Sequence, residues 1–108
     1  MKTVIHVQVR EFLESLPDAH RLKIDSTISF LQDRNGRLDR RYAKKIGDDL
    51  WELRISFGRS EYRIIYCFGV DSLMILLVGF IKKSQKIPAR IIEHAKQVRR
   101  IYLGQPPT

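Results

Sequence analysis

Apolar and polar positions along the stretch from Leu50 to Phe80 predict a small antiparallel sheet. Residues 50–57 and 61–68 are rich in aromatic and β-branched side chains, and the first of these runs alternates cleanly. Gly58-Arg59 between them suits a tight turn. A third apolar run, residues 73–80, follows a short polar segment. Three strands joined by short turns would make a meander.

The register of the first two strands decides which side chains share a face. A two-residue turn at Gly58-Arg59 would place Arg54 directly opposite Arg63, where like charges destabilise a strand pair. We interpret such a pair as a site for a multiply charged anion. A three-residue turn would separate the two arginines, and the sequence leaves both registers open. In the two-residue register, the other face is apolar and carries Trp51, Leu53, Ile55, Tyr62, Ile64 and Tyr66.

Helical periodicity precedes these strands. The apolar spacing of residues 9–16 predicts a helix that Pro17 ends. A second helix is expected to begin with Asp18 as its N-cap and to end at Asn35-Gly36. The two helices would form an antiparallel hairpin over the apolar face of the sheet, from Val9 to Asn35.

A third helix is expected after the strands. Pro88 suits its first position, and Gly104 would end it. Residues 3–7 weakly indicate a further short strand in front of the first helix. The predicted fold is therefore of the α+β class: a helical hairpin packed on a small antiparallel meander, followed by a C-terminal helix.

Composition limits the possible partners of this chain. A length of 108 residues, of which 44% are hydrophobic, supports one domain with one core. Cys67 is the single cysteine and is interpreted as a core residue, which excludes an internal disulfide. The net charge of +8 favours an acidic partner such as nucleic acid, an acidic protein or an anionic membrane. The longest apolar run is too short to span a bilayer, and the first ten residues do not resemble a signal peptide, so we expect a cytoplasmic protein.

Positive charges gather in two segments that flank the predicted strands. The first lies in the connector over residues 38–49 and just before it, and the second lies after the last strand. The first run could be no more than a solvated loop, although it leads directly into the Arg54 strand. The basic residues are Arg37, Arg40, Arg41, Lys44 and Lys45 in the first segment and Lys82, Lys83 and Lys86 in the second.

Four stretches in this order carry a family resemblance. They are residues 10–17 (REFLESLP), 50–54 (LWELR), 62–66 (YRIIY) and 77–88 (LVGFIKKSQKIP). With them the chain resembles toxins of the RelE/ParE superfamily from bacterial type II toxin–antitoxin systems. It is most similar to the HigB-like branch, which is also found in phages. The resemblance implies a single RelE/HigB-like toxin domain over residues 1–108.

The resemblance also implies an activity and partners. RelE and HigB toxins are ribosome-dependent endoribonucleases that cut mRNA in the decoding site, so we expect an mRNA interferase that inhibits translation and needs no cofactor and no metal. The expected partners are the ribosome, mRNA and a cognate antitoxin, a small helix-turn-helix protein of the HigA type with an acidic segment that covers the basic face. No membrane partner is expected.

The resemblance assigns site residues by position. Arg63 matches the central arginine of the RelE site, Arg54 matches another basic residue, and Lys83 lies near a later one. The catalytic tyrosine of RelE has no counterpart in residues 86–89, and no histidine falls on the matching strands.

The chemistry of RNA cleavage suits these residue types. Attack of the 2′-OH on phosphorus builds negative charge on the equatorial oxygens, and the guanidinium fork binds such oxygens in a bidentate way. We therefore expect Arg63 to be the main phosphate clamp and Arg54 its companion. A lysine crowded by arginines loses its proton more readily and could act as general acid or base, with Lys83 the first candidate. The expected phosphate-binding residues are Lys44, Lys45, Lys82 and Lys86.

Other side chains are interpreted more simply. Glu52 is expected to form an ion pair with an arginine, or else to act as a base, and Trp51 and Tyr66 are expected in the core. The three histidines are expected to be surface or capping residues. Because Arg63 would lie on a polar face, its removal is expected to leave the melting temperature unchanged or raised.

Two other functions remain open. ParE-like relatives share the fold and inhibit DNA gyrase without cutting RNA, and a basic module could bind RNA or ribosomes without chemistry. The paired arginines favour the endonuclease, whereas the missing tyrosine and histidine favour the alternatives.

Overall fold

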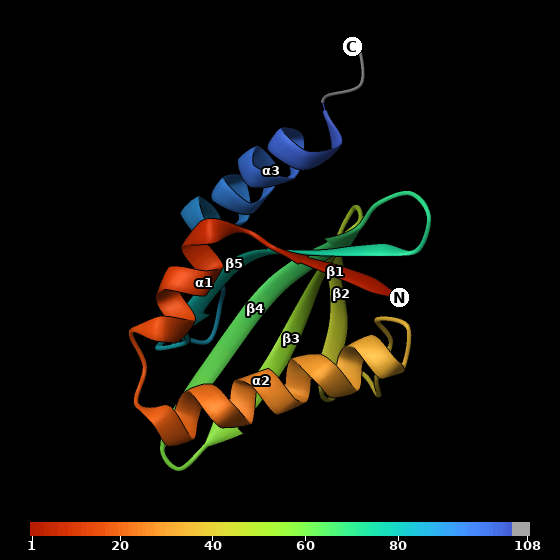
Figure 1. Ribbon diagram of the computed structural model, residues 1–108. Coiled ribbons are helices and arrows are strands. Elements are labelled where there is room, and N and C mark those ends of the chain that lie inside the picture. The colour runs from red at the N-terminus through yellow and green to blue at the C-terminus, as the bar shows by residue number, and fades with distance from the viewer. Residues whose placement is uncertain (105–108) are drawn as a thin grey trace.

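A five-stranded mixed sheet forms the centre of the molecule, in the order β1-β5-β4-β3-β2 (Figure 1). The computed structural model describes residues 1–104. Neighbouring strands are antiparallel, except that β1 runs parallel to β5. The strands are β1 (Lys2–Ile5), β2 (Ala43–Gly47), β3 (Leu50–Phe57), β4 (Ser60–Phe68) and β5 (Leu73–Ile81).

The predicted meander is confirmed as β3, β4 and β5, and the two-residue register is the one observed. Gly58 adopts a φ of 61° in the turn, a conformation that glycine tolerates at little cost. Arg54 is paired with Arg63 across β3 and β4. The α+β class is therefore correct, and the connector over residues 38–49, expected as a basic connecting segment, also contains the strand β2.

Three helices cover the sheet within the described residues. These are α1 (Val7–Glu14), α2 (Asp18–Asp33) and α3 (Ala89–Leu103). In Figure 1, α1 and α2 lie on the near side of the sheet, where α1 packs on β5 and α2 packs on β3. α3 packs against β5 and β4. In residues 1–104 we find no helix with both the length and the apolar character needed to cross a membrane.

The ends of α2 differ in part from expectation. Pro17 occupies the N-cap and Asp18 is the first helical residue, without a side-chain capping bond, so the predicted Asp18 cap is wrong. The C-terminal prediction is confirmed, because Asn35 and Gly36 take positive φ values of 57° and 79° after the helix. The carbonyl of Gly36 also accepts a hydrogen bond of 3.0 Å from the hydroxyl of Tyr66.

The first core lies between the sheet and the pair α1 and α2, as predicted. All six expected apolar sheet residues belong to it, with Trp51 partly buried at its edge. Leu53 on β3 is completely buried among residues of α1 and α2. Further members of this core are Val9, Leu13, Ile24, Ile28, Leu31, Ala43, Met74 and Leu76.

A second core occupies half of the opposite sheet face. It is formed by the apolar stripe of α3 against β4 and β5, and Cys67 is buried in it, as expected of a core cysteine. Arg99 on α3 fastens the helix to the β2–β3 turn, since its Nη1 donates to the carbonyl of Asp48 at 2.6 Å. The core residues are Leu50, Ile65, Cys67, Ile75, Leu77, Ala95 and Val98.

A bulge in the β4–β5 ladder determines which residues face the open half. The register shifts between Ile65 and Tyr66, so that one extra residue of β5 lies between two ladder pairs. After the bulge, Phe80 pairs with Arg63. Gly79 beside it approaches α1 so closely that a Cβ there would lie 2.7 Å from Cδ2 of Phe12.

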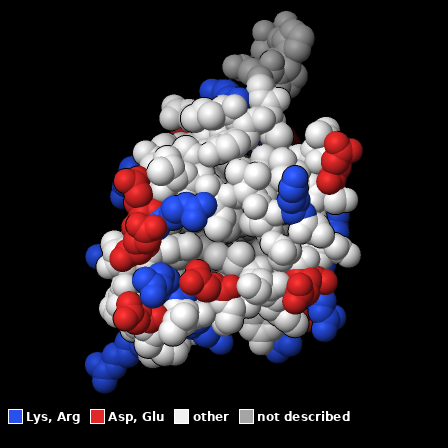
Figure 2. Space-filling model, in the orientation of Figure 1, with Lys and Arg blue, Asp and Glu red and all other residues white. Residues whose placement is uncertain are grey.

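Charge is not spread evenly over the surface. On the face that Figure 2 shows, basic and acidic side chains are interspersed between uncharged areas. The net charge of +8 therefore does not form one continuous basic surface on this face.

Candidate anion-binding site

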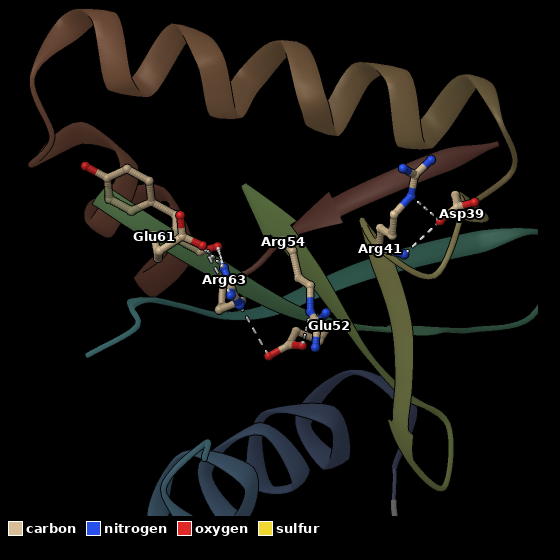
Figure 3. Close-up of polar contacts among 7 residues, drawn as sticks. Asp39, Arg41, Glu52, Arg54, Glu61 and Arg63 are labelled. Atoms are coloured by element: carbon tan, nitrogen blue, oxygen red, sulfur yellow. Dashed lines mark hydrogen bonds and ion pairs between the residues drawn. The ribbon is translucent and has the colours of Figure 1, made fainter. Parts of the chain in front are cut away.

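Charged side chains cluster on the half of the second sheet face that lies beside the α3 core. They come from alternate positions of β3 and β4, which places them on one face: Glu52 and Arg54 from β3, Glu61 and Arg63 from β4. Figure 3 shows the side chains of Glu52, Arg54 and Arg63 on the side of the sheet where α3 lies, with α2 on the other side. The pairing inferred from the sequence thus holds the two arginines together.

Glu52 lies between the two arginines and is 1% exposed. Its Oε1 accepts a hydrogen bond of 2.9 Å from Nε of Arg54. Its Oε2 lies 3.6 Å from Nε of Arg63. One buried carboxylate therefore offsets the repulsion between both guanidinium groups, which confirms the ion-pair interpretation of Glu52.

Arg63 is buried, with 7% of its surface exposed. Its Nη1 donates to the carbonyl of Tyr62 at 2.9 Å, and both terminal nitrogens lie 3.4 Å from Oε1 of Glu61. The expectation of an arginine on an open polar face is therefore wrong. The reason is that Arg63 stands in the middle of the sheet, paired with Arg54 on one side and Phe80 on the other.

The contact between Glu52 and Arg63 is an ion pair without a hydrogen bond. Oε2 of Glu52 and Nε of Arg63 are both buried and have no hydrogen-bond partner within the described residues. Buried charged groups are usually hydrogen-bonded. Glu52 consequently holds Arg63 less tightly than it holds Arg54, and a small inward shift of Arg63 would satisfy both atoms.

An open pocket of about 500 Å³ lies beside Arg63. It brings together Arg63 and Lys83, two of the three residues proposed from the sequence for catalysis, and adds Lys82. The backbone N–H of Lys82 donates to the carbonyl of Glu61 at 2.8 Å, which ties the segment after β5 to β4. The pocket thus presents three cations and one carboxylate, and its lining is Glu61, Arg63, Lys82, Lys83, Ser84 and Gln85.

Strand geometry separates the other predicted cations. Lys44 pairs with Glu52 and so shares the face of the site, whereas Lys45 pairs with Trp51 and belongs to the opposite face. The structure therefore brings Lys44, and not Lys45, to the sheet face of Glu52 and Arg54, because neighbouring strand residues point to opposite sides. Lys86 is exposed and does not line the pocket, although it lies on the same segment as Lys83.

Glu61 is the residue of the site that the sequence reasoning passed over. It stands two positions before Arg63 on the same strand, so the alternation of β4 could have indicated it. A hydrogen bond from the Ser56 hydroxyl, followed by the nearby charges of Arg63 and Lys82, holds the pKa of the Glu61 carboxyl below its usual value. Glu61 is therefore ionised at neutral pH and lies where a bound anion would meet Arg63.

None of the three histidines lines this pocket. His6 is hydrogen-bonded to the Tyr102 hydroxyl at 2.8 Å, His20 to the Tyr62 hydroxyl at 2.6 Å, and His94 to Gln8. They are thus partly exposed structural residues, close to what the sequence indicated.

The remaining reactive groups lie in the cores. Burial raises the pKa of the Tyr66 hydroxyl, and burial raises the pKa of the Cys67 thiol to about 12. Over residues 1–104, histidine, cysteine and acidic side chains form no group of three that could hold a metal ion. Among the residues that line the pocket, the side chains suited to transfer a proton are those of Lys82, Lys83 and Glu61.

Residues 11–100 match the model of a protein family described as "Phage derived protein Gp49-like (DUF891)". The match spans the first two helices, the charged strands, the pocket segment and most of α3. No curated protein matches the chain.

Proposed function

The chain belongs to the Gp49-like family of phage-derived proteins, a toxin-like family, and we propose that it is the toxin of a type II toxin–antitoxin system that cuts mRNA on the ribosome. The observation that supports this function is the pair of arginines joined through Glu52 beside a lysine-lined pocket. A HigB-like ribonuclease is the finer identity that we propose within this family.

Glu52 prepares the arginines for an anion. It contacts both guanidinium groups at Nε, and within residues 1–104 the terminal nitrogens of Arg54 make no hydrogen bond, so they can bind a phosphate. A fork held by its inner nitrogen keeps a fixed direction, which suits bidentate recognition of phosphate oxygens. In the proposed reaction Arg63 binds the equatorial oxygens of the scissile phosphate, and Arg54 stabilises the charge that develops there, each contributing about 10²-fold or more in rate.

Glu61 regulates access to Arg63. Its carboxylate contacts both terminal nitrogens of Arg63 at 3.4 Å, and its side chain is 45% exposed. Long, partly exposed contacts of this kind are weak. An incoming phosphate therefore displaces the Glu61 carboxylate from Arg63 and takes its place.

Proton transfer in this site falls to the lysines. Lys83 and Lys82 both line the pocket beside Arg63, so each lies where a 2′-OH or a 5′-oxygen would be placed by a phosphate on Arg63. We assign Lys83 as the first candidate and Lys82 as the second. Removal of the acting lysine slows cleavage without preventing substrate binding.

The test is inducible expression in a bacterium, with primer extension on an abundant mRNA. Codon-phased cuts within translated frames are expected for the wild type and are absent for Arg63→Ala. Growth arrest by the wild type without any cuts would contradict the endonuclease. Since no histidine or tyrosine lines the pocket, that result would move the chain to the non-catalytic alternatives, a gyrase inhibitor or an RNA-binding module.

A further inference from the structure

The last turn of α2 and the loop that follows it form a second cationic surface, apart from the site on β3 and β4. In Figure 3, the loop with Asp39 and Arg41 lies by the end of α2, away from Glu61 and Arg63. An open pocket of about 420 Å³ is formed there, and we call its surroundings the α2 patch. The pocket is lined by Phe30, Arg34, Arg37, Leu38, Asp39 and Tyr42.

Two aromatic rings of this patch are half-exposed. Phe30 and Tyr42 each have 49% of their surface exposed. By contrast, the rings of Trp51 and Phe68, which lie under the Arg37 guanidinium at 5.4 and 5.6 Å, pack on the first core. Phe30 and Tyr42 therefore contribute little to the core and present ring surface to a partner.

Arginines lie against both exposed rings. The guanidinium of Arg34 is 5.1 Å from the ring centroid of Phe30, and that of Arg41 is 5.4 Å from the ring centroid of Tyr42. An arginine that stacks on a ring keeps its N–H edge available for hydrogen bonds. Each ring thus has a donor for phosphate oxygens beside it.

The patch carries a net positive charge. Residues 34–41 contain four arginines and one aspartate. The aspartate is paired with one of these arginines: Asp39 Oδ1 accepts hydrogen bonds from the backbone N–H and from Nε of Arg41 at 2.9 and 3.0 Å. A partner with flat apolar faces and regularly spaced negative charges fits half-exposed rings that alternate with arginines.

We propose that the α2 patch binds single-stranded RNA, with unstacked bases against Phe30 and Tyr42 and the flanking phosphates on Arg34, Arg37 and Arg40. Every nucleobase has a face that can stack on an aromatic ring, so this site tolerates any sequence. It lies apart from the pocket beside Arg63, and its binding does not require cleavage. On a ribosome it would hold the protein to exposed RNA while the other site acts.

The test is fluorescence anisotropy with a short labelled single-stranded RNA and the full chain. Phe30→Ala and Tyr42→Ala are each expected to weaken binding about tenfold, as loss of one stacked base does. Leu22→Ala is the matched control, because Leu22 is an apolar residue on the same helix, 61% exposed, outside the patch. If Phe30→Ala does not fold, Phe30→Leu removes the aromatic face at similar volume, and the same loss is expected.

A second set of measurements separates the contribution of the bases to RNA affinity from that of the phosphates. Arg34→Ala is expected to reduce the slope of log affinity against log salt, because one phosphate contact is lost. An oligomer with the same sugar–phosphate backbone but no bases is expected to bind wild type and Phe30→Ala equally. Unchanged RNA affinity in the Phe30→Ala, Tyr42→Ala double variant would overturn the proposal. A loss of affinity only for an acidic peptide, such as oligoglutamate, would overturn it in favour of a protein partner.

Discussion

Arg63, Glu52 and Arg54 form a charge cluster in which Glu52 and Arg63 are buried and Arg54 is partly exposed. Glu52 is 1% exposed and Arg63 is 7% exposed, so neither is compensated by water. Breaking a buried pair by removing one partner leaves an uncompensated charge, which destabilises a protein more than loss of an exposed pair does. Arg63 therefore supports the fold as well as the proposed site.

Removal of Arg63 is accordingly expected to lower stability, contrary to what the sequence suggested. Arg63→Ala leaves Glu52 with Arg54 alone and should cost about 3 kcal/mol, the lower end for a broken buried pair, because the 2.9 Å bond to Arg54 remains. Thermal and urea melts measure this cost. Arg100→Ala on the exposed side of α3 is the control and should stay within about 0.5 kcal/mol of wild type. A melting temperature held or raised in Arg63→Ala would contradict the burial argument.

Glu61 gives a second prediction at this scale. Glu61→Gln removes the carboxylate that competes for Arg63, so sulfate should bind more tightly at neutral pH, as measured by calorimetry. The pKa of Glu61 is lowered in the folded protein, so its stabilising contribution is present above its ordinary pKa and is lost as pH falls through the lowered value. Glu61→Gln should therefore lose less stability than wild type on acidification. Equal sulfate binding by the two proteins would show that Glu61 does not compete.

The sequence predicts the residues of the site only in part. The pairing of Arg54 with Arg63 follows from the parity of a two-residue turn, and strand alternation then places Glu52 beside them. The burial of Arg63 could not be predicted, because it depends on Phe80 from β5 and on a bulge that no local pattern indicates. The separation of Lys45 from Lys44 could not be read from the sequence without β2, because one position along a strand reverses the face.

At the scale of elements, the strongly patterned segments were predictable, the short strand β1 was only weakly indicated by residues 3–7, and β2 was not indicated. The meander and the three helices have long apolar periodicity, and local chemistry fixes their ends to within a few residues. β2 is a five-residue edge strand with two lysines, so its apolar signal is weak. β1 pairs in parallel with β5, and the pairing of two segments so far apart in the chain produces no local sequence pattern.

The close approach of α1 to β5 gives a prediction at the element scale. Gly79→Ala would place a methyl 2.7 Å from Cδ2 of Phe12, so the Phe12 ring or α1 must shift, and the substitution should cost about 1–3 kcal/mol through overpacking. Gly47→Ala is a matched control in β2, because nothing lies within 4 Å of its added methyl. Urea melts compare the two. Equal free energies of unfolding for the two variants would mean that Phe12 and α1 move aside without loss of stability.

At the scale of the whole molecule, the excess positive charge of +8 calls for an acidic partner. An acidic antitoxin segment on the Arg63 pocket would gain charge-assisted hydrogen bonds and exclude RNA from it. If the proposed function is correct, we expect a small helix-turn-helix protein encoded beside this one to abolish ribosome binding when it is added in equal amount. Sedimentation with ribosomes measures this. Equal ribosome binding with and without that protein would contradict the expected mode of inhibition.

The proposed cleavage requires a chemical role of Arg63 that is distinct from its structural one. The measurement that tests it most directly is mRNA cleavage on programmed ribosomes by wild type and Arg63→Lys, with thermal melts run beside it. Lysine keeps the positive charge near Glu52 but lacks the guanidinium fork. We expect Arg63→Lys to remain folded and to bind ribosomes, with cleavage reduced about 10²-fold or more. Cleavage at the wild-type rate by folded Arg63→Lys would contradict the proposed mechanism.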